Sequence, residues 1–296
     1  HNALFRRLVK KGRRTSDGGY EIVCPLEYAE NATYQRYSGY DLLNIGASDV
    51  LSAAKFDWKQ QAVHVTASGL ELRQNSGKNA LIKLAKSRLK NAMTTMKNNL
   101  SGDAYSDGTA TNQINGLQAL VADNGTGTVG GIDSSTFTFW KNTVQDAGSP
   151  LQGGSAITPS STTIQSLMLP LWLRLTRGTD MPDLIVMSED WFTFYEESLT
   201  DLKRYTTSDE AQGGFVSLKY KSADVFHDSS ASGIPDGHMY FLNTDYLELV
   251  THQDCWMTTL DKKFATNQDA EVIPILSMDN ITVSNRSLQG VGHNES

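Results

Sequence analysis

The sequence has two cysteines, Cys24 and Cys255, in 296 residues, and it lacks any apolar run of membrane-spanning length. A helix that crosses a bilayer needs about 20 predominantly apolar residues. The longest apolar stretch, residues 167–175, is interrupted by Pro170 and Arg174. We therefore expect no membrane span. So few cysteines favour a reducing compartment such as the cytosol, with buried thiols rather than a disulfide bridge.

The sequence also lacks the common motifs of catalysis, cofactor binding and metal binding. It contains no G-x-S-x-G motif, no Walker lysine and no complete calcium loop. Residues 125–130 match G-x-G-x-x-G, but the serine- and threonine-rich stretch after them is a poor helix, so a dinucleotide site is not expected. The six histidines never occur at i, i+4 spacing or near a pair of cysteines. We therefore predict no enzyme activity, no cofactor and no metal site.

Acidic residues are absent from the first sixteen positions, where the basic residues are Arg6, Arg7, Lys10, Lys11, Arg13 and Arg14. The chain as a whole has a formal net charge of −7, so the rest of it is strongly acidic. A basic segment ahead of an acidic body can mark an arm that contacts nucleic acid or an acidic neighbour, although a solvated tail is the more common meaning of such a segment. Because the cations dominate this segment, we expect it to lie outside the hydrophobic core.

A long amphipathic helix is predicted at residues 77–100, after about fifty residues of extended chain. Its apolar positions recur at helical spacing and are Leu81, Leu84, Ala85, Leu89, Ala92, Met93, Met96 and Leu100. Upstream, residues 19–27 and 56–66 alternate between apolar and polar side chains and predict the two strands of a long hairpin. An isolated two-stranded hairpin is only marginally stable in water, so we expect this one to bind another copy of the protein.

The second half of the sequence predicts a mixture of helices and strands. Residues 163–177 have a helical pattern with Pro170 inside it, residues 182–187 have the pattern of a buried strand, and Ser188 is a good N-cap for a helix at 191–199. Further strands are predicted at residues 215–226, 238–249 and 270–283. The predicted fold class is α+β.

In this order, the predicted elements resemble those of tailed-bacteriophage major capsid proteins with the Hong Kong 97-type fold. Short segments are also similar: IVCPLEY at residues 22–28, YQRYSGY at 34–40, FDWKQ at 56–60, PDLIV at 182–186, YFLNTDYL at 240–247 and NRSLQG at 285–290. The resemblance extends over nearly the whole chain, and each of these segments reflects packing rather than chemistry.

The resemblance implies an N-terminal arm at residues 1–17, an extended loop (a β-hairpin) at 18–67 and a peripheral domain with a long spine helix at 68–114. An axial domain is implied at 115–246, followed by strands at 247–296 that return to the peripheral domain. Contacts between subunits would involve Tyr34, Arg36, Tyr37, Tyr40, Phe56 and Trp58. The six cations of the arm would contact DNA or a neighbouring subunit.

By this resemblance, the chain is expected to assemble as pentamers and hexamers into an icosahedral shell around double-stranded DNA, which it would contact non-specifically. Its other partners would be a portal protein and scaffolding or decoration proteins. The shell would form in the host bacterial cytoplasm and become the virion capsid. Alternatives are an encapsulin-like nanocompartment, a gene transfer agent shell and, less in keeping with the sequence, a monomeric enzyme with an unrecognised site.

Overall fold

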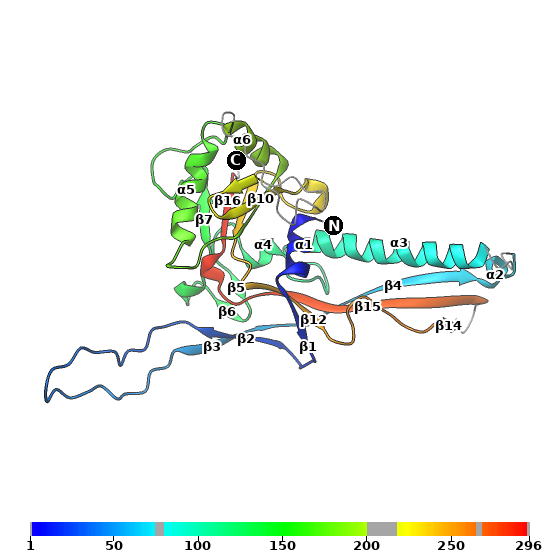
Figure 1. Ribbon diagram of the computed structural model, residues 1–296, viewed down its shortest axis with the longest axis horizontal. Coiled ribbons are helices and arrows are strands. Elements are labelled where there is room, and N and C mark those ends of the chain that lie inside the picture. Colours follow the sequence, from blue (N-terminus) through cyan, green and yellow to red (C-terminus); the bar gives the residue numbers. More distant parts are fainter. Residues whose placement is uncertain (1, 75–79, 200–217, 265–267, 295–296) are drawn as a thin grey trace.

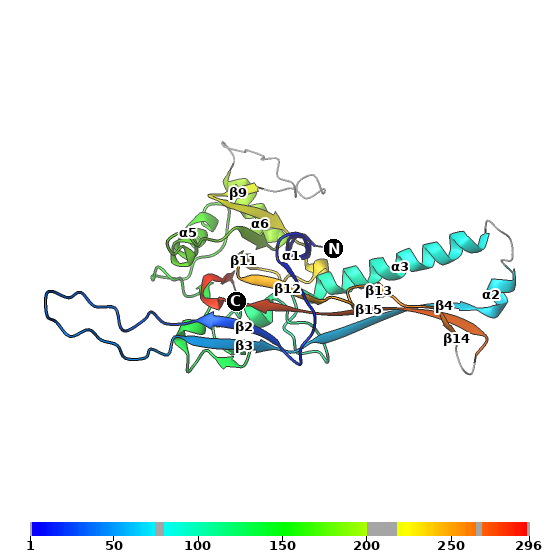
Figure 2. The same ribbon diagram turned by 60° about the horizontal axis from the view of Figure 1, so that its bottom comes forward.

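The computed structural model describes residues 2–74, 80–199, 218–264 and 268–294 of the chain (Figure 1). Two β-sheets form its body. A long helix lies along one sheet, and an extended loop projects from the opposite end of the molecule (Figures 1 and 2). This α+β arrangement agrees with the predicted class.

The first sheet, here called the peripheral sheet, is organised around β15 (Ala270–Val283), which has the bounds predicted from the sequence. β15 pairs antiparallel with β4 (Lys59–Ser68), β12 (Leu247–His252), β13 (Thr258–Thr259) and β14 (Lys263–Phe264). β1 (Arg13–Ser16) pairs parallel with β12. One fourteen-residue strand thus connects segments from both halves of the sequence.

The predicted long helix is α3 (Ala80–Asp103), which follows the short helix α2 (Gly69–Gln74) and lies along the peripheral sheet (Figure 2). Ala92, Met96 and Leu100 are buried, and Leu89 and Met93 pack against the core at its margin. Exposed lysines, among them Lys86, Lys90 and Lys97, cover the other side. The predicted stripe is confirmed for these residues; Leu81, Leu84 and Ala85 lie outside the described side chains.

The second sheet, here called the axial sheet, has six strands in the order β7-β16-β11-β8-β10-β9. They are β7 (Thr143–Asp146), β8 (Leu184–Met187), β9 (Leu218–Tyr220), β10 (Ala223–His227), β11 (His238–Leu242) and β16 (Gly290–His293). Helices α5 (Ile164–Leu175) and α6 (Glu189–Ser198) pack on it around buried Trp172, Trp191 and Phe241. Ser188 is the N-cap of α6 as predicted, but its hydroxyl donates to the Asp190 carboxylate rather than capping the backbone.

Two predicted strands are each divided in the structure. Of residues 215–226, the described part forms β9 and β10, which turn at Lys221 with a φ of 54°. Residues 238–249 form β11 and the start of β12, which belong to different sheets. Between them, Asn243 Oδ1 accepts a hydrogen bond from Asp245 N (3.1 Å) and stabilises a turn. The chain therefore passes from the axial to the peripheral sheet within four residues.

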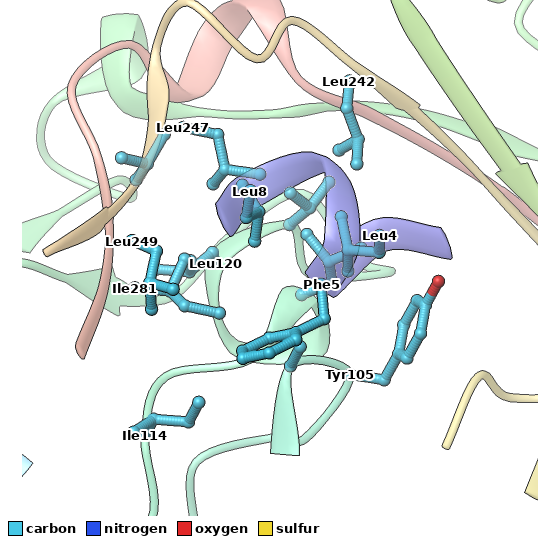
Figure 3. Close-up of a cluster of buried hydrophobic side chains, with 14 of the residues drawn as sticks. Leu4, Phe5, Leu8, Tyr105, Ile114, Leu120, Leu242, Leu247, Leu249 and Ile281 are labelled. Atoms are coloured by element: carbon cyan, nitrogen blue, oxygen red, sulfur yellow. The ribbon is translucent and has the colours of Figure 1, made fainter. Parts of the chain in front are cut away.

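The N-terminal arm is folded into the subunit, which corrects the expectation that it lies outside the core. Residues 3–10 form helix α1 (Ala3–Lys10), and its Leu4, Phe5 and Leu8 are buried among residues of both sheets (Figure 3). Asn2 Oδ1 caps the helix by accepting from Phe5 N (2.8 Å), and Asn2 Nδ2 donates to Ser101 O at the end of α3 (2.6 Å). The apolar side chains at positions 4, 5 and 8 share one helix face, and their burial places the arm in the core despite its cations.

The extended loop pairs differently from the prediction. β2 (Ile22–Glu27) pairs with β3 (Leu51–Phe56), whereas residues 59–68 pair with β15. A small hairpin of β5 (Thr128–Val129) and β6 (Ile132–Asp133) supports β3, and Gly130 O accepts from Lys55 N (2.9 Å). The G-x-G-x-x-G string therefore lies in a β-hairpin. A dinucleotide site would require it to lie at a helix N-terminus.

Arg286 fixes the loops beneath the axial sheet. It begins the 3-10 helix η4 (Arg286–Leu288) and is fully buried. Its guanidinium donates to the carbonyls of Leu120 at the end of α4 (Leu117–Leu120), Thr126 before β5 and Trp140 in η1 (Thr138–Trp140), at 2.7, 2.9 and 3.3 Å. Burial lowers its pKa to about 10, so the side chain stays charged at neutral pH. A further 3-10 helix, η3 (Ser230–Ser232), precedes β11.

Candidate assembly surface

The tip of the extended loop exposes several large apolar side chains. Residues 28–50 leave the body as two adjacent lengths of chain without regular strand structure (Figure 1). Six large apolar side chains are exposed there: Tyr34, Tyr37, Tyr40, Leu42, Leu43 and Ile45. Soluble proteins seldom expose so many clustered apolar side chains without a partner surface. The tip therefore has the character of an interface.

Four of the six predicted contact residues of the loop lie on this tip: Tyr34, Arg36, Tyr37 and Tyr40 are all exposed. Whether they touch a neighbouring copy stays a prediction. For Phe56 the prediction was wrong, because Phe56 is buried in the subunit core. Trp58 is half-buried, and its Nε1 donates to Gly19 O (3.0 Å). Both residues belong to the base of the loop, where alternating apolar side chains pack inward.

Acidic residues of the same subunit surround the predicted basic arm. Arg7 lies 3.3 Å from Asp183 and 3.9 Å from Asp224, and Lys11 Nζ lies 2.7 Å from Asp183 and 3.0 Å from Asp245. Burial alone would raise the pKa of Asp183, but hydrogen bonds from Lys11 and Thr244 lower it below its ordinary value. These contacts join α1 to the axial sheet.

The remaining cations of the arm differ in their surroundings. Arg14 Nε lies 3.1 Å from Glu248 on β12, and the Arg13 guanidinium is stacked over Trp256 at 5.4 Å from the ring centroid. Arg6 and Lys10 line a small apolar pocket with Lys97 and Trp256. A contact of any of the six cations with DNA or a neighbouring subunit stays a prediction.

Replacing Arg7 with glutamine is expected to lower the free energy of unfolding of the isolated subunit by about 1–3 kcal/mol, because Asp183 and Asp224 lose a partly buried ionic partner. Lys90→Gln, an exposed change on α3, serves as the control and is expected to have little effect. Urea denaturation followed by circular dichroism measures both. Equal stability of the two variants would contradict the role assigned to Arg7.

A buried carboxylate lies in the middle of the peripheral sheet. Asp279 on β15 is fully buried, and its Oδ2 accepts from Ser277 Oγ (2.5 Å). Burial, with the nearby charge of Asp103, raises its pKa from 3.8 to about 6. The folded subunit therefore holds this proton more tightly than the unfolded chain does.

This pKa predicts how stability depends on pH. The contribution of Asp279 is fully present below its unfolded pKa near 3.8 and is lost as the pH rises through the folded pKa of about 6. The loss amounts to about 3 kcal/mol at most. Asp279→Asn is therefore expected to raise the free energy of unfolding at pH 8 and to bring little gain at pH 4, whereas exposed Asp261→Asn should change neither. A gain independent of pH would contradict this assignment.

The described part of the chain contains histidine, cysteine, aspartate and glutamate side chains, which are the usual protein ligands of metal ions. Within it, no group of three or more histidine, cysteine, aspartate or glutamate side chains could hold a metal ion. Both cysteines are free, and burial raises the pKa of the Cys24 thiol. None of the described helices combines the length and the apolar character that crossing a membrane requires.

The sequence matches no protein-family model and no curated protein. The structure is similar to a subunit of the capsid of cyanophage A-1(L), with a TM-score of 0.69 and 15% identity over 98% of this chain and 91% of that one. It is also similar to the capsid subunit of a native GTA particle (TM-score 0.61, 11% identity, 99% and 91% coverage). A third similar structure is the holo-SrpI encapsulin complex from Synechococcus elongatus (TM-score 0.60, 8% identity, 97% and 86% coverage).

These likenesses extend over nearly the entire chain. At such low identity they establish the fold. The chain has the Hong Kong 97-type fold of tailed-phage major capsid proteins.

Proposed function

We propose that this chain is the major capsid protein of a tailed bacteriophage and assembles as pentamers and hexamers into an icosahedral shell around double-stranded DNA. The observation that carries the proposal is the projecting loop with its exposed Tyr34, Tyr37, Tyr40 and Leu42, on a body of the capsid fold. A surface of this kind gains stability when many identical neighbours cover it. Each subunit would lay its loop over the next.

The charge of the chain is consistent with a container for DNA. The formal net charge is −7, and at least four of the six cations in the arm have acidic or aromatic partners within their own subunit. An acidic inner wall repels the duplex and lets it slide during filling and ejection. DNA would thus be enclosed without sequence-specific contacts. A portal protein and scaffolding or decoration proteins would be the other partners, with assembly in the host cytoplasm.

A shell with different contents is the second candidate. It is favoured by the similarity to the capsid subunit of a GTA particle (TM-score 0.61) and to an encapsulin (TM-score 0.60). The same loop and sheets would build either shell, so the contents decide between them. A monomeric enzyme is the remaining alternative.

Analytical ultracentrifugation and electron microscopy of the purified chain test the proposal. Closed shells, or free pentamers and hexamers, are the expected particles. A single species of 32.5 kDa at all concentrations would contradict assembly and would favour the alternative of a monomeric enzyme. Nuclease-protected double-stranded DNA in particles from the native source would favour the phage or gene transfer agent, and a packaged enzyme would favour the nanocompartment.

A further inference from the structure

The sequence contains two Asn-Gly pairs, Asn115-Gly116 and Asn124-Gly125. An asparagine before glycine is especially prone to lose its side-chain amide, because glycine has no side chain that hinders attack of its own amide nitrogen on the asparagine. The structure gives the two pairs different surroundings. Asn124 is exposed in the loop between α4 and β5, whereas Asn115 is half-buried ahead of α4.

The side chain of Asn124 is held beside the nitrogen that would attack it. Asn124 Oδ1 accepts a hydrogen bond from Thr126 N (2.9 Å), which closes an Asx turn around Gly125 N. Negative charge develops on this same oxygen when the side-chain carbonyl carbon is attacked, so the hydrogen bond also stabilises the reacting state. The competing contact is the hydrogen bond from Gly125 N to Ala122 O (3.0 Å), which has to open before the nitrogen reacts.

The surroundings of Asn115 oppose the same reaction. Leu117 N, the amide two residues further on, donates to Ala104 O (2.8 Å) and not to the Asn115 side chain. Asn115 N donates to Asn280 Oδ1 on β15 (2.9 Å). A Cβ atom added at Gly116 would lie 2.2 Å from a backbone atom, so the chain is tightly packed there. Such packing resists the rotation that ring closure requires.

We propose that Asn124 is a site of spontaneous deamidation and that Asn115 is protected from it. Gly125 N forms a bond to Asn124 Cγ and gives its proton to the solvent, while the side-chain nitrogen takes up a proton and leaves as ammonia. Water then opens the cyclic imide at either carbonyl, which leaves aspartate or isoaspartate at position 124. The only co-reactant is water.

Either product changes the loop that carries it. A carboxylate at position 124 adds negative charge to a cavity of about 720 Å³ that Asp107, Asp123 and Asp146 already line, and like charges in one site repel each other. Isoaspartate also places the side-chain methylene in the main chain, two residues before Thr126. The Thr126 carbonyl accepts from Arg286 (2.9 Å), so ageing is expected to loosen this anchor of the loop.

Peptide mass spectrometry of the purified chain tests the site. After incubation in warm, mildly alkaline buffer, fragmentation spectra should locate deamidation at Asn124 about tenfold faster than at Asn115. A parallel incubation in urea removes the native surroundings of both pairs and corrects for their different neighbours in the sequence. The ratio of the native rate to the urea rate should therefore be far higher at Asn124. Equal ratios, a higher ratio at Asn115, or no reaction at Asn124 in the native chain would overturn the proposal.

Two variants test the consequence for the loop. Asn124→Gln keeps an amide but cyclises far more slowly, because its side chain is one methylene longer. Aged parent protein should melt at a lower temperature than fresh parent protein, whereas aged and fresh Asn124→Gln should melt alike. Asn115→Gln, the matched control, should lose melting temperature on ageing as the parent does. An equal loss in aged Asn124→Gln, or no loss in the aged parent, would overturn the stated effect on the loop.

Discussion

Replacement of Arg286 by methionine is expected to lower the free energy of unfolding by about 4–6 kcal/mol, which is much of the stability of an ordinary domain. The change removes the donor for three buried carbonyls, at Leu120, Thr126 and Trp140. Each carbonyl left without a partner costs about 1–3 kcal/mol. Methionine preserves much of the apolar volume of the arginine side chain, so the decrease in the free energy of unfolding comes from the lost hydrogen bonds.

Arg177→Met provides the matched control, because this exposed guanidinium donates to Ser287 Oγ (2.9 Å) on the same 3-10 helix. It should cost less than about 1 kcal/mol. Arg286→Lys should lie between the two, since an ammonium group cannot reach three acceptors in a planar fork. Thermal and urea unfolding of isolated subunits measure all three. Similar losses for Arg286→Met and Arg177→Met would show that the buried guanidinium is dispensable.

Deleting the loop tip should abolish shell formation while leaving the subunit folded. The deletion replaces residues 31–47 with two glycines, so the hydrogen bond from Tyr28 N to Val50 O (3.1 Å) is retained. The removed apolar side chains are exposed in the subunit and contribute nothing to its core. A larger deletion reaching Ala54 would be a poor test, because Ala54 and Phe56 are buried on β3.

Light scattering should find only subunits or small oligomers of this variant, and its circular dichroism spectrum and melting temperature should match those of the parent. A triple change of Leu42, Leu43 and Ile45 to serine keeps the loop length and isolates the apolar contribution. It should reduce the yield of particles strongly. Unfolding of the deletion variant would place the tip in the subunit's own core, and normal shells would remove the loop from the assembly interface.

Local sequence patterns predicted those helices and strands that can be identified without knowing which other element they pair with. The stripe of Ala92, Met96 and Leu100 gave α3, and the apolar run at residues 270–283 gave β15 with its correct bounds. The partner of β4 could not be predicted in this way. β4 pairs with a strand about two hundred residues later, and its alternating pattern fits either β15 or β2.

The N-terminal helix was predictable in principle. Asn2 is a favourable N-cap, and Leu4, Phe5 and Leu8 lie on one face, but the six cations of residues 6–14 favoured an exposed arm. Arg286 was not predictable, because an arginine in a sequence favours the surface and only the folded loops place three carbonyls around it. The exposed residues of the tip, including Tyr37 and Tyr40, followed from the resemblance.

The position of α1 has a mechanical consequence. The helix is bonded to the axial sheet through Arg7 and Asp183 and to the end of α3 through Asn2, so it bridges the crossing where the chain passes between sheets. A hinge at residues 243–246 would have to break these bonds to open. In the proposed shell, fivefold and sixfold rings would require the same subunit to meet its neighbours at different angles, and this clasp would confine the required bending to the slender loop.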